Sequence, residues 1–183
     1  MKTKIKTHTM VICTLFSALI AIGAFIKIPI PVVPFTLQFL FTTLAGMILG
    51  GKKGALSVGI YIFIGLVGIP VFASGGGIGY FIKPTFGYII GFLIGTYYTG
   101  KMVERLELTY KNLLIAGFVG LAIVYIIGMT YYFIVANFFI SSPIGIWSLI
   151  LYCFILAVPG DIFIIFICAY IGKRVIPVIG GKI

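Results

Sequence analysis

Residues 70–92 read PVFASGGGIGYFIKPTFGYIIGF, and this stretch interrupts an otherwise apolar chain. Four of the five positions from 75 to 79 are glycine, and Lys83 and Pro84 follow shortly afterwards. Glycine runs and proline do not continue a helix, yet apolar runs of helical character flank the stretch on both sides. We therefore expect a loop at the mouth of a membrane-embedded helix bundle. Irregular backbone at membrane depth is tolerated where it lines a polar cavity or is buried in protein. The loop is expected to mark a binding site, and the alternative is a long flexible connector.

The composition is that of an integral membrane protein. Of the 183 residues, 62% are hydrophobic and 9% are charged, which lies outside the range of soluble globular proteins. The net charge of +10 comes from basic residues between apolar runs, where they set topology, so no DNA or RNA partner is implied. The three cysteines occur singly in apolar runs and are expected to be small buried residues. We expect a single membrane domain over residues 1–183.

The predicted fold class is an all-α integral membrane bundle of six transmembrane helices. A span needs about 20 residues to cross the hydrocarbon core. The predicted spans are residues 11–28, 35–49, 55–69, 85–102, 113–135 and 159–172. The apolar run from 144 to 176 is too long for one span, so residues 146–157 are expected to form an extra helix at the outer surface or dipping back. Prolines 29, 31 and 34 predict an extended segment that covers the cavity mouth, and GGKKG at 50–54 predicts a tight turn.

The basic residues predict the orientation. If the amino terminus is cytoplasmic, all of the 13 Lys and Arg residues except Lys27 and Lys83 fall on inner segments. Cytoplasmic loops of membrane proteins carry an excess of Lys and Arg, so this distribution favours a cytoplasmic amino terminus. We expect both termini in the cytoplasm, with the proline segment, the glycine loop and the Pro159-Gly160-Asp161 turn outside.

Asp161 is the only acid beyond the mixed-charge turn at 101–111, and an intramembrane carboxylate is a functional hypothesis by default. The alternatives are a structural ion pair or a helix-start cap. Lys83 and Lys27 are its candidate counter-charges, unless they extend to the lipid headgroups. Gln38 is a primary amide at membrane depth, so it must bond to a ligand or to another helix.

No catalytic or metal site is predicted. A hydrolytic dyad needs a second acid, the lone His8 lies in the amino-terminal tail, and no cysteine pair has zinc-ligand spacing. The glycine run lacks the GK[ST] ending of a Walker A motif, so the chain is not expected to hydrolyse ATP. A binding component fits best, with no cofactor. A solitary proton-coupled carrier is the alternative, although no inverted repeat is visible.

The first span carries a small-residue face. Ser17 and Ala21 are spaced as small-xxx-small, which lets another helix approach closely. This pattern is compatible with packing inside the bundle and with docking of an external partner.

Four motifs in this order resemble the BioY family, the biotin-binding S component of energy-coupling factor (ECF) transporters. They are FTLQ at 35–38, GLVGIPVFA at 65–73, PTFGY at 84–88 and PGD at 159–161. The resemblance covers most of the chain from Leu15 to Asp161. It implies a six-helix bundle that captures biotin from outside, with energy from a membrane T subunit and two cytoplasmic ATPase subunits.

The resemblance also assigns roles to residues. It implies that Ser17 and Ala21 dock on the T subunit, with serine replacing the first alanine of an AxxxA-type motif. It implies a ligand contact at Asp161, but many relatives have a lysine three residues later, where this chain has Ile164. Lys83 or Lys27 could fill that role from a loop. The hypothesis is that Asp161 and Gln38 bind the ureido ring and that Tyr88 packs on the bicycle. Glycine-loop amides near Ser74, Gly75 and Gly76, or Lys83, would meet the valerate carboxylate.

Overall fold

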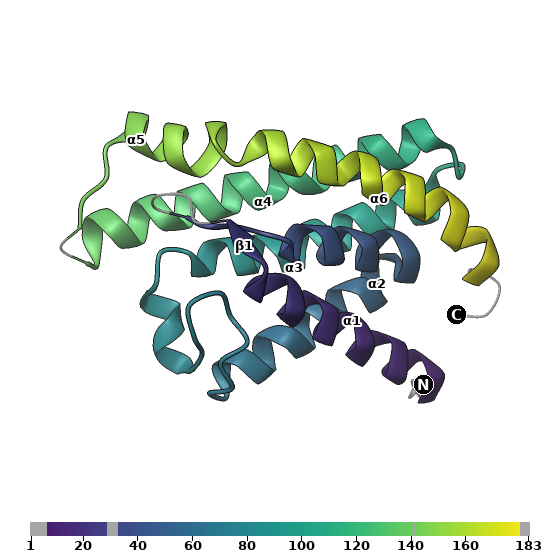
Figure 1. Ribbon diagram of the computed structural model, residues 1–183, viewed down its shortest axis with the longest axis horizontal. Coiled ribbons are helices and arrows are strands. Elements are labelled where there is room, and N and C mark those ends of the chain that lie inside the picture. The colour runs from purple at the N-terminus through teal and green to yellow at the C-terminus, as the bar shows by residue number, and fades with distance from the viewer. Residues whose placement is uncertain (1–6, 29–32, 141, 180–183) are drawn as a thin grey trace.

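The structure is a computed structural model that describes residues 7–28, 33–140 and 142–179. Prolines 29 and 31, and the lysines at 2, 4, 6 and 182 used for the orientation, lie outside these described residues. The described chain is mostly helical, as Figure 1 shows. The elements in order are α1 (Thr7–Phe25), β1 (Lys27–Ile28), β2 (Phe35–Thr36), α2 (Gln38–Leu66), the 3-10 helix η1 (Ile78–Ile82), α3 (Phe86–Arg105), α4 (Tyr110–Phe138), α5 (Ile146–Ile150), the π-helix η2 (Leu151–Ile155) and α6 (Val158–Ile179).

The helices pack in sequence order around α2 and α3. α1 lies on α2, α3 packs against both α2 and α4, and α6 covers α2 and α4. Between α1 and α2, β1 and β2 form a short antiparallel ladder in which Lys27 lies opposite Thr36. This ladder places β2 directly before the first turn of α2.

α2 consists of two halves that are joined at Gly50. Gly50 has φ 81° and ψ 175°, whereas its neighbours are helical. A Cβ atom on Gly54 would lie 2.8 Å from the carbonyl oxygen of Ala45. Nine residues of uninterrupted helix rise about 13.5 Å, so this contact requires the chain to double back. The two halves correspond to the predicted spans 35–49 and 55–69, but the predicted turn at 50–54 is wrong, because the reversal occurs at one glycine and residues 51–54 are already helical.

Glu104, on α3, caps the start of the second half of α2 at this reversal. The backbone N–H of Gly51, at the start of the second half of α2, donates a hydrogen bond of 2.8 Å to the Glu104 carboxylate. Lys101 forms an ion pair with the same carboxylate, with an N–O distance of 2.5 Å. A carboxylate at a helix start binds unsatisfied N–H groups and complements the helix dipole. The mixed-charge segment at 101–111 therefore supplies a cap for the second half of α2.

The carboxy-terminal helices differ from the prediction. A separate outer-surface helix over 146–157 is not confirmed, because α5, η2 and α6 follow one another with only two turn residues before α6, nearly end to end in Figure 1. Pro159 occupies the first turn of α6, where its missing N–H costs no intrahelical bond. α6 also continues past the predicted end at 172 to Ile179, with Pro177 in its final turn.

Four helical segments in the described part of the chain are long and apolar enough to cross a membrane. They are Thr7–Phe25, Gln38–Leu66, Tyr110–Phe138 and the run Ile146–Ile179. The count of six spans therefore remains a prediction. The start of α1 and the α3–α4 connection lie at one end of the molecule in Figure 1, and the glycine loop lies at the other. The hydrogen bond between Gly51 and Glu104, near the end of α3, places the Gly50 reversal at the first of these ends.

Candidate binding pocket

The principal pocket lies where the glycine loop meets the first turns of α2, α3 and α6. Its walls come from both β2 and the bundle. The lining residues include four predicted site residues, Gln38, Ser74, Tyr88 and Asp161. They also include residues that were not predicted: Thr36, Tyr80, Thr85, Phe92, Tyr125 and Cys153. Segments more than 100 residues apart in sequence thus form one site.

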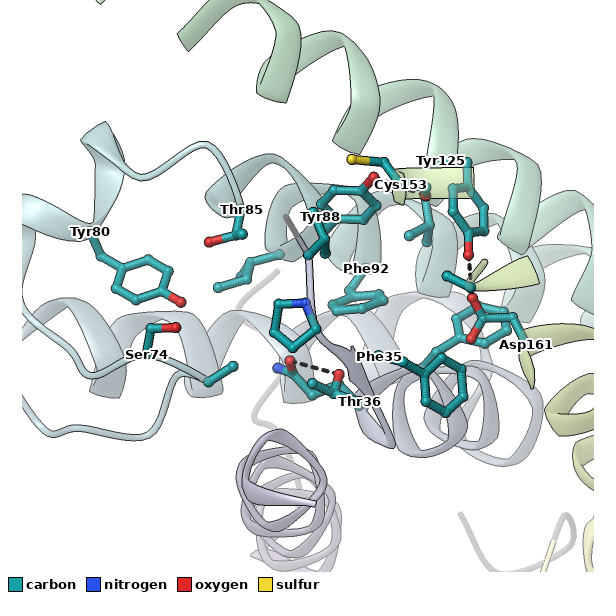
Figure 2. A pocket seen from close by; sticks show the side chains of 18 residues that line it. Phe35, Thr36, Ser74, Tyr80, Thr85, Tyr88, Phe92, Tyr125, Cys153 and Asp161 are labelled. Atoms are coloured by element: carbon teal, nitrogen blue, oxygen red, sulfur yellow. Dashed lines mark hydrogen bonds between the residues drawn. The ribbon is translucent and has the colours of Figure 1, made fainter. Parts of the chain in front are cut away.

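The pocket is polar at both ends and aromatic in between. Figure 2 shows Asp161 and Tyr125 at one end, and Ser74, Tyr80 and Thr85 at the other. Tyr88 and Phe92 lie between these two groups. Such an arrangement suits an elongated ligand that carries polar groups at its two ends and an apolar middle.

The glycine loop is folded back onto the bundle. Phe72 and Gly75 exchange backbone hydrogen bonds of 2.9 and 3.2 Å, and the N–H of Gly77 donates to the carbonyl of Gly65 at 2.7 Å. The Phe72 side chain is 1% exposed, and its ring contacts the rings of Tyr61 and Tyr80. A Cβ atom on Gly65 would lie 2.1 Å from that ring, so only glycine leaves room for it. These contacts favour the binding interpretation of the loop over a flexible connector.

Gly75, Gly76 and Lys83 do not line the pocket. Gly75 has φ 113° and forms the tight turn with Phe72. Position 76 requires glycine because a Cβ atom there would lie 2.3 Å from the carbonyl oxygen of Ile69. These glycines shape the loop, whereas the adjacent Ala73 and Ser74 reach the pocket.

Lys27 and Lys83 bind the loop backbone rather than Asp161. Lys83 Nζ donates to the Ser74 carbonyl at 2.7 Å, and Lys27 Nζ donates to the Ala73 carbonyl at 3.1 Å. The only ion pair among the described residues joins Lys101 and Glu104. The hypothesis that Lys83 or Lys27 is the counter-charge of Asp161 is therefore wrong in this conformation. Both ammonium groups lie at the loop end of the pocket.

Gln38 connects the pocket floor to the glycine loop. The side chain is 4% exposed, and its Oε1 accepts a hydrogen bond from Thr36 at 3.2 Å. Its Nε2 donates to the Tyr61 hydroxyl at 2.7 Å, and that hydroxyl donates to the Val71 carbonyl at 3.3 Å. Gln38 thus bonds to the second half of α2, which gives the buried amide the partner that it requires, and one of its two N–H groups donates to no described residue.

Asp161 lies in the first turn of α6 and is 8% exposed. Its Oδ2 accepts a hydrogen bond of 2.5 Å from the hydroxyl of Tyr125 on α4, as Figure 2 shows. Ile164, which stands where the resemblance implied a lysine, is a buried core residue 3% exposed and does not line the pocket. A sequence signal for Tyr125 did exist, since a lone phenol in the apolar run LAIVYIIGM requires a partner for its hydroxyl.

The small-residue face of α1 divides into a buried and a half-buried part. Ser17 is 3% exposed, and its hydroxyl lies 2.9 Å from the Cys13 carbonyl and 2.6 Å from the Ser57 carbonyl on α2. Ala21 is half-buried. Both residues line a largely apolar groove between α1 and the second half of α2. Ser17 therefore packs inside the bundle, and its docking role stays a prediction.

Comparisons with known proteins point to one family. The model of the BioY family matches residues 1–181. The chain is 41% identical over 169 residues to the "Probable biotin transporter BioY" of Lysinibacillus sphaericus, covering 92% of this chain and 86% of that protein. It is 40% identical over 129 residues to the "Biotin transporter BioY" of Thermotoga maritima, covering 70% of this chain and 73% of that protein.

A solved structure has the same fold. It is the crystal structure of the S-component for biotin from an ECF-type ABC transporter, with a TM-score of 0.78 and 29% sequence identity. The match covers 95% of this chain and 93% of that one. Because the relatives are transporters, the prediction that the chain is not an enzyme is confirmed. The apolar helices and these relatives together identify a multi-pass membrane protein. The chain is a member of the BioY family.

Proposed function

We propose that this protein is the high-affinity biotin-binding subunit of an ECF-type transporter. In this proposal it captures biotin from outside and delivers it with a T subunit and two ATPase subunits. The observation that carries the proposal is the elongated pocket, which has a buried carboxylate at one end and the glycine loop at the other. Biotin has a ureido ring at one end, a carboxylate at the other and an apolar middle, so its chemistry matches the pocket.

The charge distribution favours one direction of binding. Asp161 would repel the valerate carboxylate and would accept a hydrogen bond from a ureido N–H. Lys27 and Lys83, at the loop end, would attract the carboxylate. We therefore place the ureido ring at Asp161, with Gln38 as a second polar partner and Tyr88 against the bicycle. The carboxylate would lie near Ser74 at the loop end.

The binding proposal is tested with Asp161→Asn. A hydrogen bond to a charged group is worth about 1.5–3 kcal/mol, so we expect biotin affinity to fall by about 10- to 100-fold. Isothermal titration of the purified protein measures this. Glu107→Gln is the matched control, because it removes a carboxylate outside the pocket and should leave affinity unchanged. Equal affinities of Asp161→Asn and the unaltered protein would contradict the proposed pose.

The partner proposal rests on the groove beside α1. We propose that a helix of the T subunit occupies this groove, which Ala21 lines together with Ser17. Ala21→Leu should abolish biotin uptake with the full transporter and leave binding intact. Val11→Leu, on exposed surface of the same helix, should preserve both uptake and binding. Loss of binding by Ala21→Leu would show that this face serves internal packing. Uptake by this chain alone, driven by a pH gradient, would instead favour a solitary carrier.

For the transmembrane topology, we propose six spans, counting the two halves of α2 separately and including α3, with both termini in the cytoplasm. The arrangement of the glycine loop and the Gly50 reversal at opposite ends of the molecule supports it. Labelling of single cysteines introduced at Lys53 and Ile78 tests the orientation, and only the second should react from outside.

A further inference from the structure

Asp161 is a buried carboxylate without a cationic partner among the described residues. Its side chain is 8% exposed, and the single ion pair of the described chain lies elsewhere. Removing an acid from water without a counter-charge is unfavourable, unless other groups bind its oxygens. In the described structure, the group that does so is the hydroxyl of Tyr125, which donates to Oδ2 at 2.5 Å.

The Tyr125 ring packs against two other aromatic rings, and its hydroxyl bonds to Asp161. It meets Tyr88 edge-on, with centroids 6.2 Å apart and planes at 90°. It meets Phe154 in the same manner, at 5.1 Å and 81°. Tyr125 is 5% exposed, and these edge-to-face contacts restrict its ring orientation. The position of its hydroxyl is therefore fixed by packing and not by Asp161 alone.

The other carboxylate oxygen remains available. Oδ1 accepts no hydrogen bond from the described residues, whereas Oδ2 is bound to Tyr125. No fully enclosed side-chain oxygen in the described part of the chain lacks a partner, so Oδ1 is accessible, and Asp161 lines the pocket. The Phe35 ring packs against the same turn, 2.6 Å from where a Cβ atom on Gly160 would lie, and it also lines the pocket. The carboxylate thus has one oxygen for the protein and one for a ligand.

We propose that Tyr125 is a positioning residue for ligand recognition: it holds Oδ2 of Asp161 so that Oδ1 faces the ligand. This inference rests on the proposed function and adds a residue to it. The neutral phenol stabilises the carboxylate without cancelling its charge, which leaves Oδ1 a strong acceptor. The site therefore selects a ligand with an N–H donor at this end, as the ureido ring of biotin provides.

The test is Tyr125→Phe, which removes the hydroxyl and keeps the ring contacts. We expect biotin affinity to fall by about tenfold. Tyr132→Phe is the matched control, because Tyr132 lies two turns further along α4 and does not line the pocket. The biotin affinity of Tyr132→Phe should equal that of the unaltered protein. Thermal midpoints of all variants, measured without ligand, verify that each one folds.

Two further measurements separate positioning from general structural support. In the Asp161→Asn background, Tyr125→Phe should cost less than twofold, because the carboxylate that it positions is gone. With a biotin analogue methylated at the ureido nitrogen that faces Asp161, Tyr125→Phe should also have little effect. Removal of a purely structural contact would weaken biotin and the analogue equally.

The outcomes are distinct. Failure of the unaltered protein to bind biotin would overturn the proposed function, and this inference with it. If the unaltered protein binds biotin but Tyr125→Phe binds it as tightly, the inference is overturned and the function stands. Equal losses for biotin and the methylated analogue would overturn the inference in the same way. A loss for biotin alone, absent in the Asp161→Asn background, would establish it.

Discussion

Three glycines of the loop allow a sharp test of how the loop is built, because each is glycine for a different reason. A Cβ atom on Gly76 would lie 2.3 Å from the carbonyl oxygen of Ile69 and 3.0 Å from that of Gly65. Gly75 has open space around it but a φ of 113°. Gly79 has open space, lies in η1 and is not among the positive-φ glycines. Alanine should therefore be harmful at 76, intermediate at 75 and harmless at 79.

The magnitudes follow from these contacts. At Gly76 the obstructing atoms are backbone, so the loop must move by about 1 Å to restore ordinary contact, and overpacking of this kind costs about 1–3 kcal/mol. At Gly75 the unfavourable backbone conformation costs about 1 kcal/mol or somewhat more. At Gly79 a surface change of this type should stay within about 0.5 kcal/mol. For a protein of this size, 1 kcal/mol shifts the thermal midpoint by about 2–4 °C.

The assay combines thermal unfolding in detergent with biotin titration of each variant. Gly76→Ala should lower the midpoint by several degrees and weaken biotin binding, because movement of the loop displaces Ser74 at the pocket wall. Gly79→Ala should match the unaltered protein in both measurements. A Gly76→Ala protein with normal stability and affinity, or a Gly79→Ala protein as damaged as Gly76→Ala, would refute the loop geometry.

Two further predictions concern the anchor of the loop and the reversal of α2. Phe72→Ala should destabilise the protein by about 3–5 kcal/mol, because it leaves a cavity in place of a ring that is 1% exposed. Thermal unfolding checks this, and Phe63→Ala, at a side chain that is 68% exposed, is the control that should change little. The Lys101 ammonium lowers the pKa of the Glu104 carboxyl below its ordinary value of 4.5, and the N–H of Gly51 acts in the same direction. Because the folded-state pKa is the lower one, this carboxylate stabilises the fold above about pH 4.5, and the contribution is lost as pH falls through the folded-state pKa. Glu104→Gln should therefore reduce the midpoint at pH 7 by a few degrees but by much less in acid, and an equal reduction at both pH values would argue against the cap.

Much of the fold could be predicted because glycine and proline interrupt apolar runs at recognisable points. The glycine loop and the helix start at Pro159 follow from those interruptions. Gln38 and Asp161 were predicted as polar groups at membrane depth, whereas Ser74 and Tyr88 were predicted from the family resemblance, and all four line one pocket. The reversal at Gly50 was expected to need five residues, since sequence alone does not show that one glycine with positive φ and a capping carboxylate from another helix are sufficient.

The remaining differences have a common physical reason. In a membrane protein both the lipid-facing and the buried faces of a helix are apolar, so periodicity does not show which neighbour a side chain meets. The side that Ser17 faces, and the approach of Tyr125 to Asp161, were therefore not predictable from α1 or α4 alone. The partners of Lys27 and Lys83 depend on the path of the loop backbone, which supplies carbonyl acceptors that the amino-acid pattern does not reveal.

Mass spectrometry of small molecules released from the purified protein tests directly whether the pocket binds biotin. We expect biotin to be released in near-equal molar amount when the protein is prepared from cells supplied with biotin, and no ATP to be consumed in binding it. Release of a different vitamin from folded protein, with no biotin retained even after its addition, would show that biotin is not the ligand.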